Sequence, residues 1–337
     1  MPAISVLMPV YNAGQFLKEA VDSILNQTFT DFEFLIFNDG STDDSKKILS
    51  AYTDPRIRLM NFDINQGYVP LLNLGLEIAR GEYIARMDAD DVSAVTRFQK
   101  QYEFLQQHPD YILCGSRYTI IGTGRKFNLP IDDHEIKLRM LCSNPLCHPS
   151  ILVRKEILSR NNIRYDERHM PSEDFEMWTQ LSDFGKFYNF SESLLFYRLH
   201  NNNISFRKQT QEQEGFFRLT RKKYISKFFR NTGLTDFGEA TLYELFSGNY
   251  SDYKDLLKFR DLLQKIIKAN YRYAVRSDEV HSFLEQCYFN QCTASTRLGI
   301  KAFLLGNEFG FYKIPWMLNL KLLIKSVIRY QPISFRS

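Results

Sequence analysis

The chain has 337 residues, of which 44% are hydrophobic and 24% are charged, and its formal net charge at pH 7 is +4. This composition is typical of a globular protein with one large or two ordinary domains. The small net charge excludes the strong basic bias of a dedicated nucleic-acid binder, so we expect no nucleic-acid partner. Aromatic residues reach 15%, which is enough for a core and for part of a ligand site.

The cysteine count is odd, and no two cysteines have the two-residue gap of a zinc knuckle. We therefore expect free thiols in a reducing compartment. The cysteines are Cys114, Cys142, Cys147, Cys287 and Cys292. Residues 1–10 lack the basic start of a signal peptide, and no run of 18 apolar residues occurs, so neither a leader nor a membrane-spanning helix is expected. These features predict a cytoplasmic protein.

Short apolar strands alternate with amphipathic helices through the first 91 residues. Strands are predicted at 4–11, 32–37, 57–61 and 82–87, and helices at 16–25, 45–52 and 71–79. This rhythm predicts an α/β fold with a doubly wound, mostly parallel, Rossmann-like sheet. Ligands of such sheets bind beyond the carboxyl ends of the strands. The polar clusters lie there, at Asn12, 38–39, 65–66 and 88–91.

The pattern becomes polar and helical from about residue 205. A long helix is predicted at 209–229, and further helical patterns follow at 255–269, 281–292 and 295–305. We therefore expect a catalytic domain at 1–205 and a mainly α-helical C-terminal domain at 206–337, without a disordered hinge between them.

Three carboxylates lie within four residues at the end of the strand predicted at 82–87. They belong to Asp88, Asp90 and Asp91. Their mutual repulsion is costly without a cation, and Mg²⁺ or Mn²⁺ prefers oxygen ligands and can bridge to phosphates. A solvated acidic turn that caps the next helix is the other interpretation, and this short motif alone leaves both open.

Two further acidic motifs follow predicted elements. Asp39 lies just after the second predicted strand, where dinucleotide-binding folds place a carboxylate that accepts hydrogen bonds from a base or a ribose. A role in the geometry of the turn is its other interpretation. Asp43 and Asp44 are better placed to cap the next helix. Glu173 and Asp174 begin an amphipathic helix, where a carboxylate can act as a general base or simply complement the helix dipole.

These motifs, taken in order, resemble family 2 glycosyltransferases of the GT-A fold, of the inverting, non-processive bacterial type. The segments that carry the resemblance are 6–12 (VLMPVYN), 38–43 (NDGSTD), 65–67 (NQG), 88–91 (DADD), Arg97 with Lys100 and Gln101, Glu173 with Asp174, and 197–200 (YRLH) with Ser205. The resemblance covers about residues 1–205, some three-fifths of the chain. Each motif is weak alone, whereas the ordered set is specific.

The resemblance implies that the nucleotide-sugar donor binds to residues of the first half. The implied contacts are Pro9, Val10 and Tyr11 at the nucleobase, Asp39 at the base, most often uracil, Asn65 and Arg97 in the donor site, Asp88 at the ribose and metal, and Asp91 either at the donor sugar or in support of the site. Asp90 would contact a divalent metal, Mn or Mg, on the diphosphate. His200 would join the metal or phosphate side, and a hydrogen-bonded loop histidine is its other interpretation.

The resemblance also implies that Asp174 is the catalytic base, with Glu173 as its neighbour. The base would take the proton of an acceptor hydroxyl as that oxygen attacks the anomeric carbon, and a single displacement would invert this centre. His148, within the segment 147–150, is expected to contact the acceptor. Structural packing is its other interpretation.

The chain departs from the processive members of the family, because Gln-x-x-Arg-Trp is absent and Trp occurs only as Trp178 and Trp316. We therefore expect transfer of one hexosyl or N-acetylhexosaminyl group per event, from a UDP sugar to a glycan or lipid-linked saccharide in polysaccharide biosynthesis. The first loop, 12–15, lacks the basic Gly-rich sequence of a nucleotidyltransferase and the G-x-G-x-x-G of a dehydrogenase. A non-catalytic nucleotide-sugar or carbohydrate-binding protein is the alternative of another class, although mere binding needs no base.

A basic amphipathic segment is predicted at 309–337. Lys321, Lys325 and Arg329 are four residues apart, so on a helix they share one face. Such a helix suits an anionic membrane surface and would hold the protein peripherally on the inner face of the cytoplasmic membrane. Packing on the helical domain, or on a second subunit of a homo-oligomer, is the other interpretation.

Overall fold

The computed structural model describes residues 1–141, 143–200, 203, 211–231, 257–258 and 260–261. The chain divides into two compact units, Met1–Arg139 with Asn144–Phe217 and Met140–Ser143 with Arg218–Ser337. The helical patterns predicted beyond residue 231 and the basic segment 309–337 lie outside the described residues, apart from 257–258 and 260–261. The domain boundary expected at residue 205 therefore stays a prediction.

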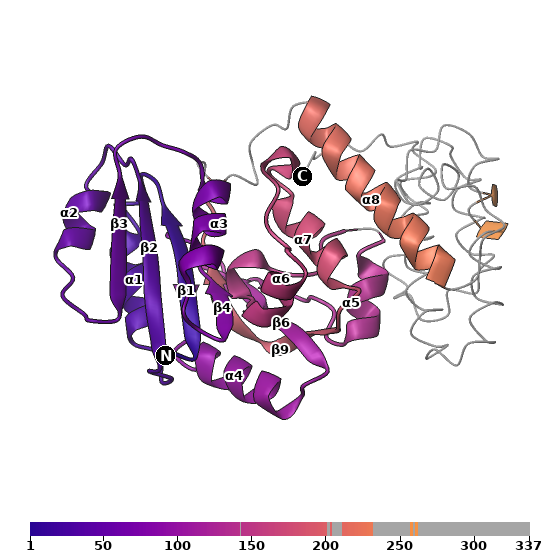
Figure 1. Cartoon of the computed structure of the whole chain (residues 1–337), viewed down its shortest axis with the longest axis horizontal. Coiled ribbons are helices and arrows are strands. Elements are labelled where there is room, and N and C mark those ends of the chain that lie inside the picture. Colours follow the sequence, from indigo (N-terminus) through magenta and orange to yellow (C-terminus); the bar gives the residue numbers. More distant parts are fainter. Residues whose placement is uncertain (142, 201–202, 204–210, 232–256, 259, 262–337) are drawn as a thin grey trace. The chain divides into compact units, whose positions relative to one another are not determined.

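Strands and helices alternate through the first unit (Figure 1). The strands are β1 (Ile4–Val10), β2 (Phe32–Asp39), β3 (Ile57–Phe62), β4 (Tyr83–Arg86), β5 (Val92–Ser93), β6 (Tyr111–Ile120), β7 (Lys126–Phe127), β8 (Leu152–Arg154) and β9 (Lys186–Tyr197). The α-helices are α1 (Leu17–Leu25), α2 (Ser45–Ser50), α3 (Tyr68–Ile78), α4 (Arg97–Gln107), α5 (Asp133–Arg139), α6 (Lys155–Arg160), α7 (Glu173–Leu181) and α8 (Gln211–Asn231), the last of which continues into the second unit. Short 3₁₀ helices occur at His148–Ser150 and Glu167–His169.

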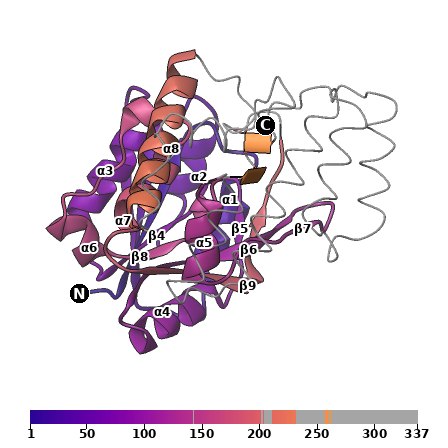
Figure 2. The same cartoon turned by 90° about the vertical axis from the view of Figure 1, so that its right-hand side faces the viewer.

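The strands form one sheet in the order β3-β2-β1-β4-β8-β6-β9-β5, with β7 paired to β6. Strand β1 pairs in parallel with β2 and β4, and β2 pairs in parallel with β3. Strand β8 is antiparallel to β4 and β6, whereas β6 and β9 run side by side in parallel (Figures 1 and 2). Most paired residues lie in parallel ladders, so the predicted α/β fold with a mostly parallel sheet is confirmed.

Helices α1 and α3 cover opposite faces of the parallel half of the sheet. Side chains alternate along a strand, and Val6 and Met8 of β1 join the buried cluster that contains Ile24 of α1. Leu7 points to the other face, where it meets Gly75 of α3 so closely that an added Cβ would lie 2.8 Å from Leu7. Burial on both faces explains why β1 and β2 are apolar over most of their length.

This arrangement places the carboxyl ends of β1, β2 and β4 at one edge of the sheet, because the three strands are parallel. The residues that follow these ends include Tyr11 after β1 and Asp88 after β4, while Asp39 is the last residue of β2. The polar clusters predicted from the sequence therefore meet at this edge.

Cys114 and Cys147 are buried and free, as expected, and the other three cysteines lie outside the described part. None of the described helices combines the length and the apolar character that crossing a membrane requires.

Within the second unit, the Nε of Arg221 in α8 donates to the backbone oxygen of Leu141 at 2.9 Å.

Candidate active site

Three carboxylates gather directly after β4, and we call Asp88, Asp90 and Asp91 the acidic triad. One oxygen from each lies within 4.8 Å of the others. Asp88 and Asp90 are partly exposed, whereas Asp91 is buried. Burial, with the added charges of Asp88 and Asp90, raises the pKa of the Asp91 carboxyl well above its usual range. Negative charges this close favour a counter-charge.

The segment after β9 supplies hydrogen-bond donors to the acidic triad. The backbone N–H of Arg198 donates to Oδ1 of Asp91 at 2.8 Å, and its Nε donates to the backbone oxygen of Asp90 at 2.8 Å. Nε2 of His200 lies 2.8 Å from Oδ2 of Asp90. The structure thus brings together the two motifs 88–91 and 197–200, which lie more than 100 residues apart in the sequence.

The acidic triad fits a divalent cation. Oδ2 of Asp91 is buried and has no hydrogen-bond partner among the described residues. A buried polar atom without a partner costs about 1–3 kcal/mol, and more when it is charged, so this oxygen is suited to a ligand that brings positive charge. Carboxylate oxygens are the ligands that Mg²⁺ prefers, and they suit Mn²⁺ as well.

Arg86, the last residue of β4, is a buried cation that the sequence motifs did not single out. Its Nη1 contacts Oδ2 of Asp88. Burial raises the pKa values of Asp91, Glu173 and Asp174, and the charge of Arg86 opposes this rise in all three. One feature of the sequence could have identified Arg86: it is a basic residue on an otherwise apolar strand, two positions before the acidic triad.

The first turn of α7 carries a second acidic group, and we call Glu173 and Asp174 the carboxylate pair. Asp174 is partly exposed; its Oδ2 accepts from Nδ2 of Asn144 at 2.7 Å and its Oδ1 from the N–H of Phe175 at 2.6 Å. Burial raises the pKa of Asp174 to about 6, a value suited to a base that is ionised at neutral pH. Glu173 is 3% exposed, and burial together with the charge of Asp174 raises its pKa to about 7.

The end of β1 offers an open aromatic surface. Tyr11 is 50% exposed, Pro9 is partly exposed and Val10 is buried. Oδ1 of Asn12 accepts from the N–H of Thr42 at 2.8 Å, which ties the loop after β1 to the loop after β2. Stacking of a nucleobase against Pro9 and Tyr11 stays a prediction, and their exposure leaves room for it.

Asp39 is buried and both of its carboxylate oxygens are occupied. Oδ1 accepts from the N–H of Gln66 at 2.7 Å, and Oδ2 accepts from the N–H of Gly67 at 2.9 Å. Nδ2 of the exposed Asn65 donates to the backbone oxygen of Asp39 at 3.3 Å. Asp39 therefore fixes the loop 65–67 beside the end of β2, and contacts of Asp39 and Asn65 with a base stay predictions.

Arg97 and His148 are enclosed by the protein. Arg97 is 0% exposed, and its Nη2 donates to the backbone oxygens of Arg86 at 2.9 Å and Ile151 at 3.1 Å. It supports the end of β4, and a contact of Arg97 with the donor stays a prediction. His148 is buried with Nε2 2.8 Å from the hydroxyl of Tyr165. This position favours packing, and a contact of His148 with the acceptor stays a prediction.

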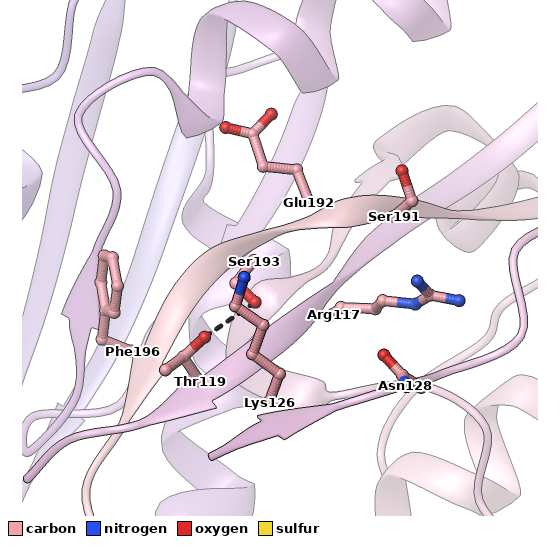
Figure 3. Close-up of a pocket in the computed structure, with 8 residues that line it drawn as sticks. All are labelled: Arg117, Thr119, Lys126, Asn128, Ser191, Glu192, Ser193 and Phe196. Atoms are coloured by element: carbon pink, nitrogen blue, oxygen red, sulfur yellow. Dashed lines mark hydrogen bonds between the residues drawn. The ribbon is translucent and has the colours of Figure 1, made fainter. Parts of the chain in front are cut away.

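A surface depression of about 400 Å³ lies against β6, β7 and β9 (Figure 3). Its lining residues are Arg117, Thr119, Lys126, Asn128, Ser191, Glu192, Ser193 and Phe196. The hydroxyl of Thr119 donates to that of Ser193 at 2.9 Å across the strands. The depression shares no residue with the acidic triad or the carboxylate pair, so its concavity alone does not make it the active site.

The sequence model of the family described as "Glycosyl transferase family 2" matches residues 5–175. An uncharacterized glycosyltransferase of Haemophilus influenzae is 30% identical over 247 residues, which cover 69% of this chain and 76% of that protein. The O-antigen biosynthesis glycosyltransferase WbnJ of Escherichia coli is 30% identical over 243 residues, 69% of this chain and 92% of that protein. The chain belongs to glycosyl transferase family 2, which confirms the resemblance.

The fold is also found in solved structures. The chain is similar to Staphylococcus aureus TarS 1-349, with a TM-score of 0.56 and 16% identity over 99% of this chain and 93% of that chain. The structure of TarS 1-349 in complex with UDP-GlcNAc matches with a TM-score of 0.59 and 16% identity, over 97% of this chain and 91% of that chain. The predicted GT-A type fold is thus confirmed.

Proposed function

We propose that this glycosyltransferase is metal-dependent and inverting, and that it transfers one sugar from a UDP sugar to a hydroxyl of a glycan or lipid-linked saccharide. The observation that carries the proposal is the presence of two separate acidic groups, the acidic triad after β4 and the partly exposed Asp174 at the start of α7. A single displacement needs two such groups, one that offsets the charge of the leaving diphosphate and one that takes the proton of the acceptor.

The UDP donor is proposed because TarS 1-349, which shares the fold, forms complexes with UDP-GlcNAc and with UDP. The half-exposed ring of Tyr11, next to the residue that ties the loop after β1 to the loop after β2, offers this chain a surface for the base. A role in polysaccharide biosynthesis is proposed from the O-antigen biosynthesis glycosyltransferase among the relatives.

The two acidic groups have different tasks in the proposed reaction. Asp174 takes the proton of the acceptor hydroxyl, and Asn144 orients its carboxylate. Asp88, Asp90 and His200 would hold the divalent metal, which supplies positive charge to the diphosphate when bound. The acceptor oxygen attacks from the side opposite the leaving group, so the anomeric configuration is inverted.

The test is to incubate the protein with a panel of nucleotide sugars and saccharide acceptors and to measure release of nucleoside diphosphate. We expect release with at least one UDP sugar, dependent on Mg²⁺ or Mn²⁺, and a product whose anomeric configuration by NMR is opposite to that of the donor. Release of pyrophosphate would instead indicate a nucleotidyltransferase, and binding without release would indicate a non-catalytic binding protein. A product with retained configuration would contradict the inverting mechanism.

A further inference from the structure

A hydrogen bond between a tyrosine and a carboxylate joins the first residues of two helices. The hydroxyl of Tyr68, which begins α3, donates to Oε2 of Glu173, which begins α7, at 2.8 Å. Burial and the charge of Glu173 raise the pKa of the Tyr68 hydroxyl, so the hydroxyl stays protonated and acts as the donor. The bond connects positions that are 105 residues apart in the sequence.

The start of α3 is tied to the nucleotide side of the proposed site. Gln66 and Gly67, the two residues before Tyr68, donate their backbone N–H groups to the carboxylate of Asp39 at 2.7 and 2.9 Å. Gly67 has a φ of +88°, a conformation that favours glycine. Hydrogen bonds therefore connect Asp39, at the end of β2, to the loop 65–67, and the next residue, Tyr68, is hydrogen-bonded to Glu173.

The other oxygen of Glu173 faces a buried and uncharged group. Nδ1 of His148 lies 4.0 Å from Oε1 of Glu173, and Nε2 of the same ring lies 2.8 Å from the hydroxyl of Tyr165. Burial lowers the pKa of His148 well below its usual range, so the ring is neutral. The side chain of Asn73 in α3 exchanges two hydrogen bonds with the backbone of Tyr165, at 2.8 and 2.9 Å. Helix α3 thus binds Glu173 through Tyr68, and through Asn73 it also fixes Tyr165 beside the His148 ring.

Glu173 and Asp174 are neighbours in different environments. Glu173 is enclosed, and one of its oxygens is taken by Tyr68. Asp174 is partly exposed, with its carboxylate oriented by Asn144 and the N–H of Phe175. A general base must come within about 2.6–3.2 Å of the proton-bearing atom of the substrate. The partly exposed carboxylate of Asp174 can do this, whereas the carboxylate of Glu173, which is enclosed by the protein, cannot.

We infer that Glu173 is a positioning residue and that Tyr68 is its partner. Through their hydrogen bond, the loop 65–67 on the nucleotide side fixes the first turn of α7, and with it the direction of the Asp174 carboxylate. The inference rests on the proposed function, which makes Asp174 the base. Neither Glu173 nor Tyr68 exchanges a proton with the substrate.

The test compares Glu173→Gln with Glu173→Ala in the full chain. Gln keeps an oxygen that accepts the Tyr68 hydrogen bond but has no basicity, whereas Ala removes the acceptor. A positioning role predicts that Glu173→Gln retains kcat within about tenfold of the wild type, and that Glu173→Ala is slower by about a further tenfold. The KM for the nucleotide sugar should be unchanged in both variants. A base at position 173 would make the two variants equally inactive.

Tyr68→Phe removes the same hydrogen bond from its other end. We expect kcat to fall about three- to tenfold, and the double variant with Glu173→Ala should be no slower than Glu173→Ala alone, because one shared interaction is lost. Tyr52→Phe is the matched control, since the hydroxyl of Tyr52 donates to the carboxylate of Asp22 at 2.7 Å outside the proposed site. This control should leave kcat unchanged.

Thermal unfolding and UDP binding, measured on every variant, separate loss of fold from loss of positioning. The inference is overturned if Glu173→Gln is as slow as Glu173→Ala or if the losses from Tyr68→Phe and Glu173→Ala add. If Glu173→Ala does not fold, equal kcat in Tyr68→Phe and Tyr52→Phe overturns it. In these cases wild-type transfer leaves the proposed function intact. A wild type that transfers no sugar from any donor contradicts the proposed function and the inference together.

Discussion

The two acidic groups of the site differ in what surrounds them. The groups that contact the acidic triad are positively charged or are ring nitrogens, and they belong to Arg86, Arg198 and His200. The carboxylate pair is met mainly by neutral donors, from Tyr68 and Asn144. Three carboxylates within 4.8 Å favour a cation, whereas the partly exposed Asp174, with a pKa of about 6, can accept a proton near neutral pH. The difference suits the acidic triad to a metal and Asp174 to proton transfer.

The largest effect is expected when the acidic triad is broken. Asp90→Ala removes the carboxylate that meets His200, and we expect no measurable transfer because the diphosphate loses its metal. Excess chelator should abolish transfer by the wild type, and added Mg²⁺ or Mn²⁺ should restore it, as measured by release of nucleoside diphosphate. Full wild-type activity in excess chelator would contradict the metal assignment.

Asp174→Asn changes the partly exposed member of the carboxylate pair. It keeps the shape of the side chain and removes its basicity. Loss of a positioned base typically costs about 10²–10⁴-fold in rate, so kcat should fall by this factor while donor affinity stays at the wild-type value. Asp110→Asn is the control, because Asp110 is an exposed carboxylate paired with Lys186. Loss of donor affinity with continued turnover of bound donor would show that Asp174 has another role.

The pH dependence of transfer should report the pKa of Asp174, the proposed base. Burial is the main cause that raises the pKa of Asp174 to about 6 and that of Glu173 to about 7. A base works only when it is deprotonated, so activity is present above the raised pKa of Asp174 and is lost as the pH falls through it. We expect kcat/KM to fall about tenfold per unit below roughly pH 6. A pH–rate profile that stays flat to roughly pH 5 would contradict a carboxylate base with this pKa.

The charge of Arg86 acts on both acidic groups. Substitution of this residue should change activity less than the variants above. Its charge opposes the rise in pKa that burial causes in Asp91, Glu173 and Asp174. In Arg86→Gln the acidic limb of the pH–rate profile should therefore move to higher pH, by roughly one unit. Arg86→Lys keeps the charge and should keep most of the wild-type profile. Identical profiles for the Gln variant and the wild type would show that this charge does not act on the base.

The smallest effect on catalysis is expected from removing 309–337, a segment outside the described residues. Both acidic groups remain, so transfer to a water-soluble acceptor should be unchanged. Binding to anionic vesicles should weaken, because each basic residue near such a surface contributes about 1 kcal/mol. Co-sedimentation at low and high salt measures this loss, and light scattering shows whether a homo-oligomer dissociates instead. Equal partitioning of both chains would exclude this segment as the membrane contact.

The parallel half of the fold could be predicted from the sequence because each of its elements has a local pattern. The strands up to β4 are short apolar runs that end in polar residues, and helices with an apolar stripe separate them. Strands β6 and β9 lack such a signal. Their pairing joins residues more than 70 positions apart, and its register shifts near Ser116 and Arg117. Such pairing depends on tertiary packing, which no local pattern encodes.

The candidate site could likewise be predicted only where its residues form a local pattern in the sequence. The acidic triad and Asp174 stand out because several carboxylates lie close together in the sequence. The role proposed for Tyr68 could not be predicted from the sequence, because it depends on a partner 105 residues away. Arg97 shows the reverse: its position matches a family motif, yet its guanidinium is fully buried against backbone oxygens. Burial of a side chain is a property of the folded chain, which a sequence motif does not encode.

The central claim is that the acidic triad binds the donor through a cation and that Asp174 acts on the acceptor. Calorimetric titration of UDP into Asp90→Ala and Asp174→Asn, each with and without Mn²⁺, tests this claim most directly. The predicted result is Mn²⁺-dependent UDP binding with wild-type affinity in Asp174→Asn and its loss in Asp90→Ala. Loss of Mn²⁺-dependent binding in Asp174→Asn, with binding retained in Asp90→Ala, would contradict the assignment of both groups.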